Sequence, residues 1–307
     1  MSQTIDSMKY ADLHVHTFYS DSTFSPQEVV SYAKAKNLSA IAICDHDTVD
    51  GIEPCMAIGD EAGIEIIPGI EMSVEKIDAE IHLLGYFIDW KQDWLRKKLK
   101  IIQDSRVERI HLIMEKLKSL GISVDVEEVF KIAVNKGSVG RLHVAKAMLN
   151  SRVVKNLREA FDKYIGFSKP CYVPYTKLLP GEAVEFILKA GGVPVIAHPR
   201  LMGNDEYIDE FIHYGLRGLE VYHTDHKPHI SRHYEAIAKE KGLIMTGGSD
   251  CHGYGKAKIL MGSVTMPYST VDELKREKKF PSIFELVPNK ESVLPKENLN
   301  VMYLNLF

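Results

Sequence analysis

Two histidines lie one residue apart in the stretch DLHVHTFYSD, which covers residues 12–21 and ends in an aspartate. Residues two apart in a strand project from the same face, so the imidazoles of His14 and His16 should point together. Imidazoles with a nearby carboxylate, here Asp21, are typical ligands of zinc, manganese and iron. An HxH motif alone is weak evidence, because a strand can carry two ordinary polar residues.

Further residues of metal-ligating type lie at or just past the ends of predicted strands: His46, Glu71, His82, His198, Asp250 and His252. His82 fits least well, because it begins its predicted strand. The carboxyl ends of the strands in a parallel α/β barrel meet at one rim, so these side chains should converge with the first three. Any one of these histidines alone could be a structural residue, but clustered carboxylates without a cation would repel one another. The nine residues therefore predict a site for two or three divalent metals (Mn, Fe or Zn).

Short apolar runs alternate with helical patterns through most of the chain, which predicts an α/β fold with right-handed crossovers between parallel strands. Ser25, Pro26 and Glu28 predict a capped helix start, and the run SAIAIC predicts a strand covered on both faces. About seven strand–helix units favour a barrel over an open sheet. The predicted strands are Tyr10–Val15, Ser39–Cys44, GIEIIPGIEMSV, EIHLLGYF, Val193–Ala197, Leu216–Tyr222 and Leu243–Gly247.

A different pattern interrupts this alternation, because residues 91–120 read as one long charged amphipathic helix without a following strand. Further helices are predicted at Val126–Val134, Arg141–Asn150 and Val153–Tyr164. We expect residues 1–94 and 171–307 to form the barrel, and residues 95–170 an all-helical insertion that caps the substrate. The basic residues of this insertion could roof the cleft, but a solvated helix face is the favoured interpretation for Lys97, Lys98, Arg106 and Arg109. The tail after Pro281 has too little pattern for an assignment.

The composition excludes several classes of protein. The 307 residues are 45% hydrophobic and carry a net charge of −4, so charge alone does not favour binding to duplex DNA. The four cysteines form no CxxC pair and suit a reducing compartment. No stretch reaches 18 apolar residues, so we expect no membrane segment. These features predict a cytoplasmic protein, either a monomer or a small homo-oligomer.

The motifs resemble those of the PHP (polymerase and histidinol phosphatase) family of metal-dependent phosphoesterases, in its stand-alone bacterial branch. The shared motifs are DLHVHTFYSDST, DHDTVDGIEP, GIEMSV, IHLLGY, GRLHVAKAML, KPCYVP, AHPR, GLEVYH and SDCH. The chain has SDST where relatives usually have SDGT, but Asp21 is retained. The resemblance covers roughly residues 9–255.

This resemblance implies a distorted (β/α)7 barrel of the TIM type holding up to three metals. It places the first metal on His14, His16, Glu71 and Asp250. It places the second on Glu71, His82 and His198, and the third on Asp21, His46 and His252.

Other residues are candidates for substrate contact. Arg141 and His143, at the start of a predicted helix, could hold a phosphate or could equally belong to an ordinary surface helix. Lys169 could also hold a phosphate, although a solvated lysine is the favoured interpretation for it. Arg200 should lie near the metals, and His223 could act as a general acid or be structural.

Two more sets of polar residues have expected roles. Asp45 and Asp47 should orient the metal-binding imidazoles through hydrogen bonds. The remaining histidines should be surface residues: His111, His213, His226, His229 and His233.

Adjacent divalent cations suit hydrolysis at phosphorus, with a metal-bridging hydroxide as the nucleophile. The resemblance implies a small nucleotide or short oligonucleotide substrate, either a nucleoside 3′,5′-bisphosphate or the 5′ end of a short RNA. Two alternatives remain open. One is a phosphatase of the histidinol phosphate type, which the helical insertion disfavours. The other is a non-catalytic PHP module, which the complete ligand set disfavours.

Overall fold

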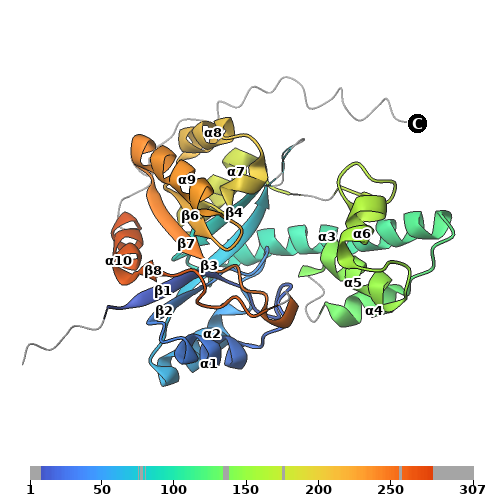
Figure 1. Cartoon of the computed structure of the whole chain (residues 1–307), viewed down its shortest axis with the longest axis horizontal. Helices are drawn as coiled ribbons and strands as arrows, with labels where there is room; N and C mark the ends of the chain where they lie inside the picture. Colours follow the sequence, from blue (N-terminus) through green and yellow to red (C-terminus); the bar gives the residue numbers. More distant parts are fainter. Residues whose placement is uncertain are drawn as a thin grey trace, which may run out of the picture.

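A computed structural model of the chain describes residues 8–74, 76, 79, 81–133, 138–174, 177–255 and 258–278. Eight strands form one sheet in the order β7-β6-β5-β4-β3-β2-β1-β8, which curls into a nearly closed barrel (Figure 1). The strands are β1 Tyr10–Val15, β2 Ala40–Ile43, β3 Glu65–Val74, β4 Ile81–Tyr86, β5 Val193–Ile196, β6 Gly218–His223, β7 Ile244–Gly248 and β8 Met266–Pro267. The predicted α/β barrel is confirmed, and the two-residue β8 is an addition to it.

The barrel closes where the carboxyl end of β7 approaches β1. His16 N–H donates to Cys251 O at 3.1 Å, and Val15 pairs in parallel with Cys251. Gly248 permits this approach, because a Cβ there would lie 2.4 Å from the His14 backbone nitrogen. Thus Asp250 and His252 come next to the first histidine pair, although more than 230 residues separate them along the chain.

The prediction of parallel strands is wrong for β4, which pairs antiparallel with both β3 and β5. Only six residues join Val74 to Ile81, too few for the crossover that a parallel neighbour requires. The amino end of β4 therefore lies beside the carboxyl end of β3, with His82 opposite Ser73. This explains why His82 reaches the rim although it begins its strand.

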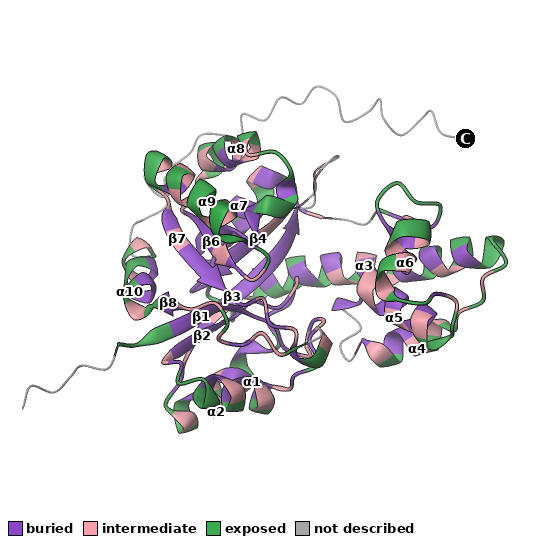
Figure 2. Cartoon of the chain, viewed as in Figure 1, coloured by how far each residue is buried: buried purple, intermediate pink, exposed green. Residues whose placement is uncertain are grey.

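Helices cover the outside of the barrel, and the strands are largely buried (Figure 2). Ser25 and Glu28 form the predicted capping box, and Gly63 ends the following helix with a φ of 73°. The helices that surround the barrel are α1 Pro26–Ala35, α2 Ile52–Ala62, α7 Pro180–Lys189, α8 Glu206–Tyr214, α9 Pro228–Lys241 and α10 Tyr268–Glu277. None of the helices among the described residues is long and apolar enough to cross a membrane. The tail after Pro281 lies outside those residues.

The segment between β4 and α7 is helical and extends away from the barrel (Figure 1). Its elements are α3 Asp93–Ser119, α4 Val126–Ile132, α5 Arg141–Asn150, α6 Leu157–Ala160 and the π-helix η2 Phe161–Ile165. The predicted helix at Val153–Tyr164 begins later than expected, because Asn156 is its N-cap and accepts a hydrogen bond from Glu159 N–H.

The long helix α3 belongs to two hydrophobic cores. Its first half packs Leu95, Leu99 and Ile102 into the main core of the barrel. Its second half packs Ile110 and Leu117 into a separate core built by the other insertion helices. One continuous helix therefore joins the two parts.

A buried ion pair fixes α3 to the barrel rim. Arg106 donates to Asp47 Oδ2 through Nε at 3.0 Å and to Ser73 Oγ at 3.0 Å, and Gln103 donates to Asp47 O. Arg109 donates to Val173 O at 2.6 Å. Both arginines are buried, so the interpretation of a solvated helix face is wrong for them, whereas Lys97 and Lys98 are exposed.

Replacing Arg106 with Met should lower the free energy of unfolding by roughly 3 kcal/mol, because the buried Asp47 carboxylate loses its cation. Urea unfolding followed by circular dichroism would measure this change. Lys98→Met, an exposed change on the same helix, is the control and should stay within about 0.5 kcal/mol of the parent. Equal stability of the two variants would mean that the ion pair adds no net stability.

Candidate metal centre

The structure brings the nine predicted ligand residues together at one rim of the barrel. They come from the ends of β1, β2, β3, β5 and β7, from the start of β4, and from the loops that follow β1 and β7. His14 and His16 lie on the same face of β1, as their spacing predicted, and both are fully buried.

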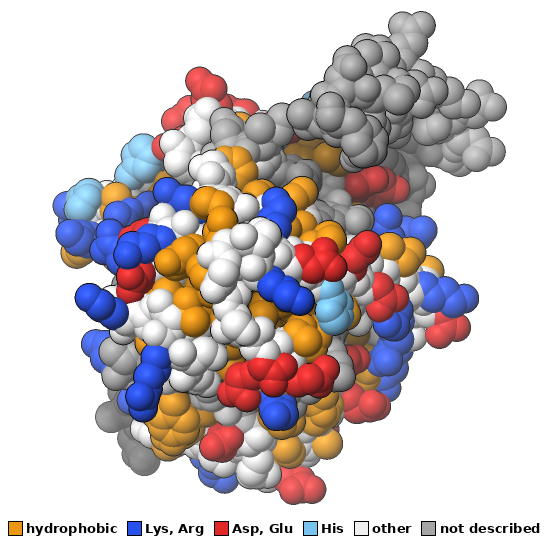
Figure 3. Space-filling view, turned by 90° about the vertical axis from the view of Figure 1, so that its right-hand side faces the viewer, with side chains coloured by type: hydrophobic (Ala, Val, Ile, Leu, Met, Phe, Trp, Pro, Cys, Tyr) orange, Lys and Arg blue, Asp and Glu red, His pale blue; other side chains and the backbone are white. Residues whose placement is uncertain are grey.

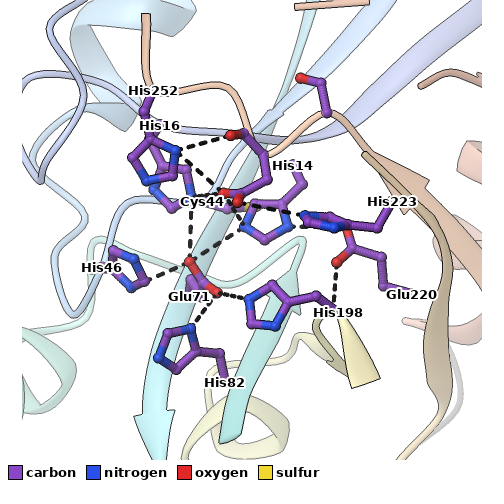
Figure 4. Close-up of polar contacts among 12 residues, drawn as sticks. His14, His16, Cys44, His46, Glu71, His82, His198, Glu220, His223 and His252 are labelled. Carbon is purple, nitrogen blue, oxygen red and sulfur yellow. Dashed lines mark hydrogen bonds and ion pairs between the residues drawn. The ribbon is translucent and has the colours of Figure 1, made fainter. Parts of the chain in front are cut away.

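Glu71 lies at the centre of this cluster and is 1% exposed (Figure 4). Five imidazole nitrogens lie within 3.3 Å of its two carboxylate oxygens. They are His82 Nδ1 at 2.9 Å and His198 Nε2 at 3.0 Å on Oε1, and His46 Nδ1 at 3.2 Å, His14 Nε2 at 3.3 Å and His16 Nε2 at 3.3 Å on Oε2. One carboxylate thus touches five ligand candidates from four separate segments of the chain.

The other two carboxylates extend the cluster to one side. Asp250 Oδ1 lies 3.1 Å from His16 Nε2 and 3.7 Å from His14 Nε2. Asp21 Oδ1 lies 3.0 Å from His252 Nε2, and its Oδ2 lies 3.8 Å from His46 Nε2. The arrangement alternates carboxylates with imidazoles, which is the donor set that borderline divalent metals prefer.

The cluster contains buried polar atoms that fit a cation better than a hydrogen-bonded network. Within the described part of the chain, His14 Nε2, both ring nitrogens of His16, His46 Nδ1 and Glu71 Oε2 are buried without a hydrogen-bond partner. Such groups are costly unless a cation engages them.

Three groups of side chains have ligand atoms that all lie within 4.8 Å of one another. They are His14–His16–Asp250, His46–Glu71–His82 and His16–Asp21–His46–His252. These groups overlap with the three that the resemblance implies, but they place His46 beside Glu71 as well as beside Asp21.

Burial and mutual contact also determine the protonation of these residues. Burial lowers the pKa of His16 to about 4, so its ring is neutral near pH 7 and one ring nitrogen has a lone pair available to a cation. Burial opposes the charge of Glu71, but the neighbouring imidazoles of His46, His14 and His82 hold the pKa of its carboxyl well below the usual value. His252 and His46 have the same effect on the pKa of Asp21.

Asp45 and Asp47 do not contact imidazoles, contrary to expectation. Asp45 accepts hydrogen bonds from Thr17 N–H at 2.7 Å, from Thr17 Oγ1 at 2.6 Å and from Ser20 Oγ at 2.6 Å. It therefore fixes the loop that carries Asp21. Asp47 instead binds Arg106 and Ser73 N–H.

Glu220 is a buried carboxylate that the sequence reasoning did not select. Its Oε1 lies 2.9 Å from His14 Nδ1, and its Oε2 accepts a hydrogen bond from His198 N–H at 2.7 Å. The only signal available in the sequence was an acidic residue in the apolar run GLEVYH.

His223 follows Glu220 on β6 and faces the cluster. Its Nδ1 accepts a hydrogen bond from Asp225 N–H at 3.2 Å, so the neutral ring carries its proton on Nε2. That nitrogen lies 3.5 Å from Asp250 Oδ2. His226 is not the surface residue that was expected, because it is 9% exposed and its Nδ1 contacts Val221 O at 2.9 Å.

Two adjoining cavities open onto the cluster. The first, of about 320 Å³, is lined by seven of the nine clustered side chains, all except His14 and His16, together with Leu201, Asp225 and His223. The second, of about 150 Å³, lies between the barrel and the insertion and shares Asp21, His46 and His82 with the first. Its lining includes Arg106, Arg109, Arg141, Lys177, His143, Ser73 and Ser138. We call this second cavity the cationic pocket.

Not all of the predicted substrate contacts reach these cavities. Arg141 and His143 line the cationic pocket, and burial lowers the pKa of His143 to about 4. Lys169 is exposed and lines neither cavity, whereas Lys177 lines the pocket. Arg200 is exposed and donates to Asp225 O at 3.1 Å, so it contacts the rim without lining the cavity over the cluster.

Comparison with known proteins identifies the family. Residues 12–166 match the family model described as the PHP domain. A 3′,5′-nucleoside bisphosphate phosphatase from Chromobacterium violaceum is 32% identical over 254 residues, which cover 81% of this chain and 89% of the relative. The chain belongs to the PHP family.

Other PHP proteins are similar over most of their length. A 5′-3′ exoribonuclease from Haemophilus influenzae is 32% identical over 249 residues, which cover 80% of this chain and 90% of the relative. A solved structure from Bifidobacterium adolescentis, assigned as a metal-dependent phosphoesterase, has a TM-score of 0.80 and 29% identity, covering 89% of this chain and 98% of that one. The predicted family and enzyme class, a metal-dependent phosphoesterase of the PHP type, are confirmed.

Mn²⁺ or Zn²⁺ should stabilise the metal-free protein, because the cation engages the buried nitrogens around Glu71. At a concentration of about 100 times Kd, the gain should be about 2.7 kcal/mol, measurable as a rise in Tm by calorimetry. Ca²⁺ is the control, since it prefers oxygen ligands and should have a much smaller effect. Equal stabilisation by Ca²⁺, or no change with any of the three ions, would contradict the assignment.

Proposed function

We propose that this PHP protein hydrolyses phosphate esters of nucleotides, either nucleoside 3′,5′-bisphosphates or the 5′ ends of short RNAs. The observation that carries the proposal is the cationic pocket, which directly adjoins the cluster around Glu71. A substrate with a single phosphate would need only the cluster. The additional pocket suits a substrate with a second phosphate close to the first.

In this proposal the nine clustered side chains hold two or three divalent cations, Mn, Fe or Zn, and Glu71 is shared between two of them. When bound, such cations neutralise phosphoryl charge and make a water molecule nucleophilic near neutral pH. The contacts of Glu71 with five imidazoles support this role, because a bridging carboxylate must be reached from several sides.

The cationic pocket would bind the second phosphate of the substrate. Arg141 lies at the first residue of α5, and its guanidinium stacks near Phe161 and Tyr172, with 5.6 Å to each ring centroid. These contacts fix the guanidinium, so a phosphate could be held with little loss of side-chain freedom. Lys177 adds a second positive charge from the segment that precedes α7. We propose accordingly that residues 95–170 act as a substrate cap.

His223 would donate a hydrogen bond from Nε2–H to the leaving oxygen of the ester and so stabilise the negative charge that develops there. The hydrogen bond from Asp225 N–H leaves the proton of the neutral ring on Nε2, which faces the cavity beside Asp250. Arg200 and Lys169 line neither cavity, so the proposal gives them no contact with the substrate.

The face of the molecule that carries the insertion mixes acidic and basic side chains (Figure 3). The cationic pocket differs from this mixed surface, because three arginines and one lysine line its small volume. This contrast supports a small nucleotide or a single-stranded end as the substrate, rather than duplex DNA, which requires a broad basic surface.

The Mn-loaded protein should release phosphate from adenosine 3′,5′-bisphosphate or shorten a 5′-phosphorylated RNA oligomer, and it should be slow on histidinol phosphate. His14→Ala should abolish turnover, because it removes a side chain in contact with both Glu71 and Asp250. His213→Ala, an exposed change on α8, should leave the rate unchanged. Preferential turnover of histidinol phosphate would indicate the small-molecule phosphatase. No turnover of any substrate, with metal bound, would indicate a non-catalytic module.

Lys177→Met should raise KM for the bisphosphate about tenfold to a hundredfold, because it removes a charged contact with the second phosphate. The rate on 4-nitrophenyl phosphate, which has one phosphate, should change little. Lys169→Met is the matched control, since that lysine lies outside both cavities. An equal effect of Lys177→Met on both substrates would exclude the pocket as a second phosphate site.

A further inference from the structure

The carboxylate of Glu220 connects two of the proposed metal ligands from outside the cluster (Figure 4). It is completely buried on β6, at the position that pairs with Thr246 on β7. Each of its oxygens has one partner among the candidate ligands: the His14 ring on Oε1 and the His198 backbone on Oε2.

The contact with His14 decides which ring nitrogen can bind a cation. An ionised carboxylate only accepts hydrogen bonds, so the atom facing it at 2.9 Å must be Nδ1–H. The lone pair of the neutral ring is then on Nε2, which lies 3.3 Å from Glu71 and 3.7 Å from Asp250. Glu220 therefore directs the binding nitrogen of His14 toward the two carboxylates that would share its cation.

The contact with His198 acts on the backbone. His198 has a φ of 25° and a ψ of 63°, a conformation that a residue with a side chain rarely adopts. The hydrogen bond from its N–H to Glu220 helps to hold this conformation, in which the ring places Nε2 at 3.0 Å from Glu71 Oε1. His14 and His198 thus approach different oxygens of Glu71, and the same carboxylate supports both.

We propose that Glu220 is a positioning residue that sets the metal affinity of the cluster, by fixing the tautomer of His14 and the backbone of His198. This inference rests on the proposed ligand roles of these two histidines. It differs from a purely structural role, in which Glu220 would only join β6 to its neighbours and its removal would change stability alone.

Glu220→Gln separates the two roles. The amide oxygen can still accept from His198 N–H, but the amide NH₂ then faces His14 Nδ1 and favours the tautomer protonated on Nε2. Zinc affinity, measured by titration calorimetry, should fall about tenfold to a hundredfold for one bound equivalent. Nitrogen-15 spectra of the zinc-loaded protein should show a proton on His14 Nδ1 in the parent, and that proton should be absent in the variant.

Thr246→Val is the matched control, because it removes a buried hydroxyl at the residue that pairs with Glu220, and that hydroxyl forms no hydrogen bond with either histidine. It should bind zinc as the parent does. Parent-like zinc affinity in a folded Glu220→Gln protein would overturn the proposal. If that variant does not fold, the parent spectrum still decides: a zinc-loaded His14 without a proton on Nδ1 would overturn it. Weakened zinc binding in the variant, together with a parent that hydrolyses none of the phosphate esters, would refute the proposed function and leave this inference standing.

Discussion

A buried carboxylate surrounded by imidazoles is the constraint on which this structure depends. Glu71 is almost inaccessible to solvent, yet five histidine rings from four segments of the chain contact its two oxygens. Burying a carboxylate is costly unless opposite charge or hydrogen bonds surround it. The barrel meets this requirement because histidines at several strand ends lie at the same rim. The imidazoles therefore reach Glu71 only when these strands are assembled in the barrel.

A second layer of carboxylates holds the first in place. Asp12, Asp45, Asp47 and Glu220 are all buried, and each accepts hydrogen bonds from groups in other segments of the rim. Asp12, for example, accepts from Ser249 N–H and Gly262 N–H, and burial raises the pKa of its carboxyl to about 6. The loops at the rim are therefore ordered by side chains rather than by strand pairing.

The sequence predicted the barrel and the convergence of the nine residues well, because apolar runs and strand-end positions are local patterns. It did not predict that β4 runs antiparallel, since a short connection between two strands is the only sign of that reversal. It also missed Glu220 and Lys177 and misjudged Arg106, because their roles arise from contacts between distant segments. A buried arginine and a solvated one look alike within a helical pattern, and only the packing distinguishes them.

The helix α3 joins the barrel and the helical insertion in one continuous element, because it contributes side chains to both hydrophobic cores and has no break between them. One residue added or removed between Arg106 and Ile110 would turn its outer half by about 100° and shift it by about 1.5 Å, while the contacts of Arg106 with the barrel are kept. The roof of the cationic pocket would then face another direction while the barrel stayed intact. With the substrate role proposed for the cationic pocket, substrate choice in this architecture could therefore diverge through the length of a single helix, without any change to the nine clustered residues.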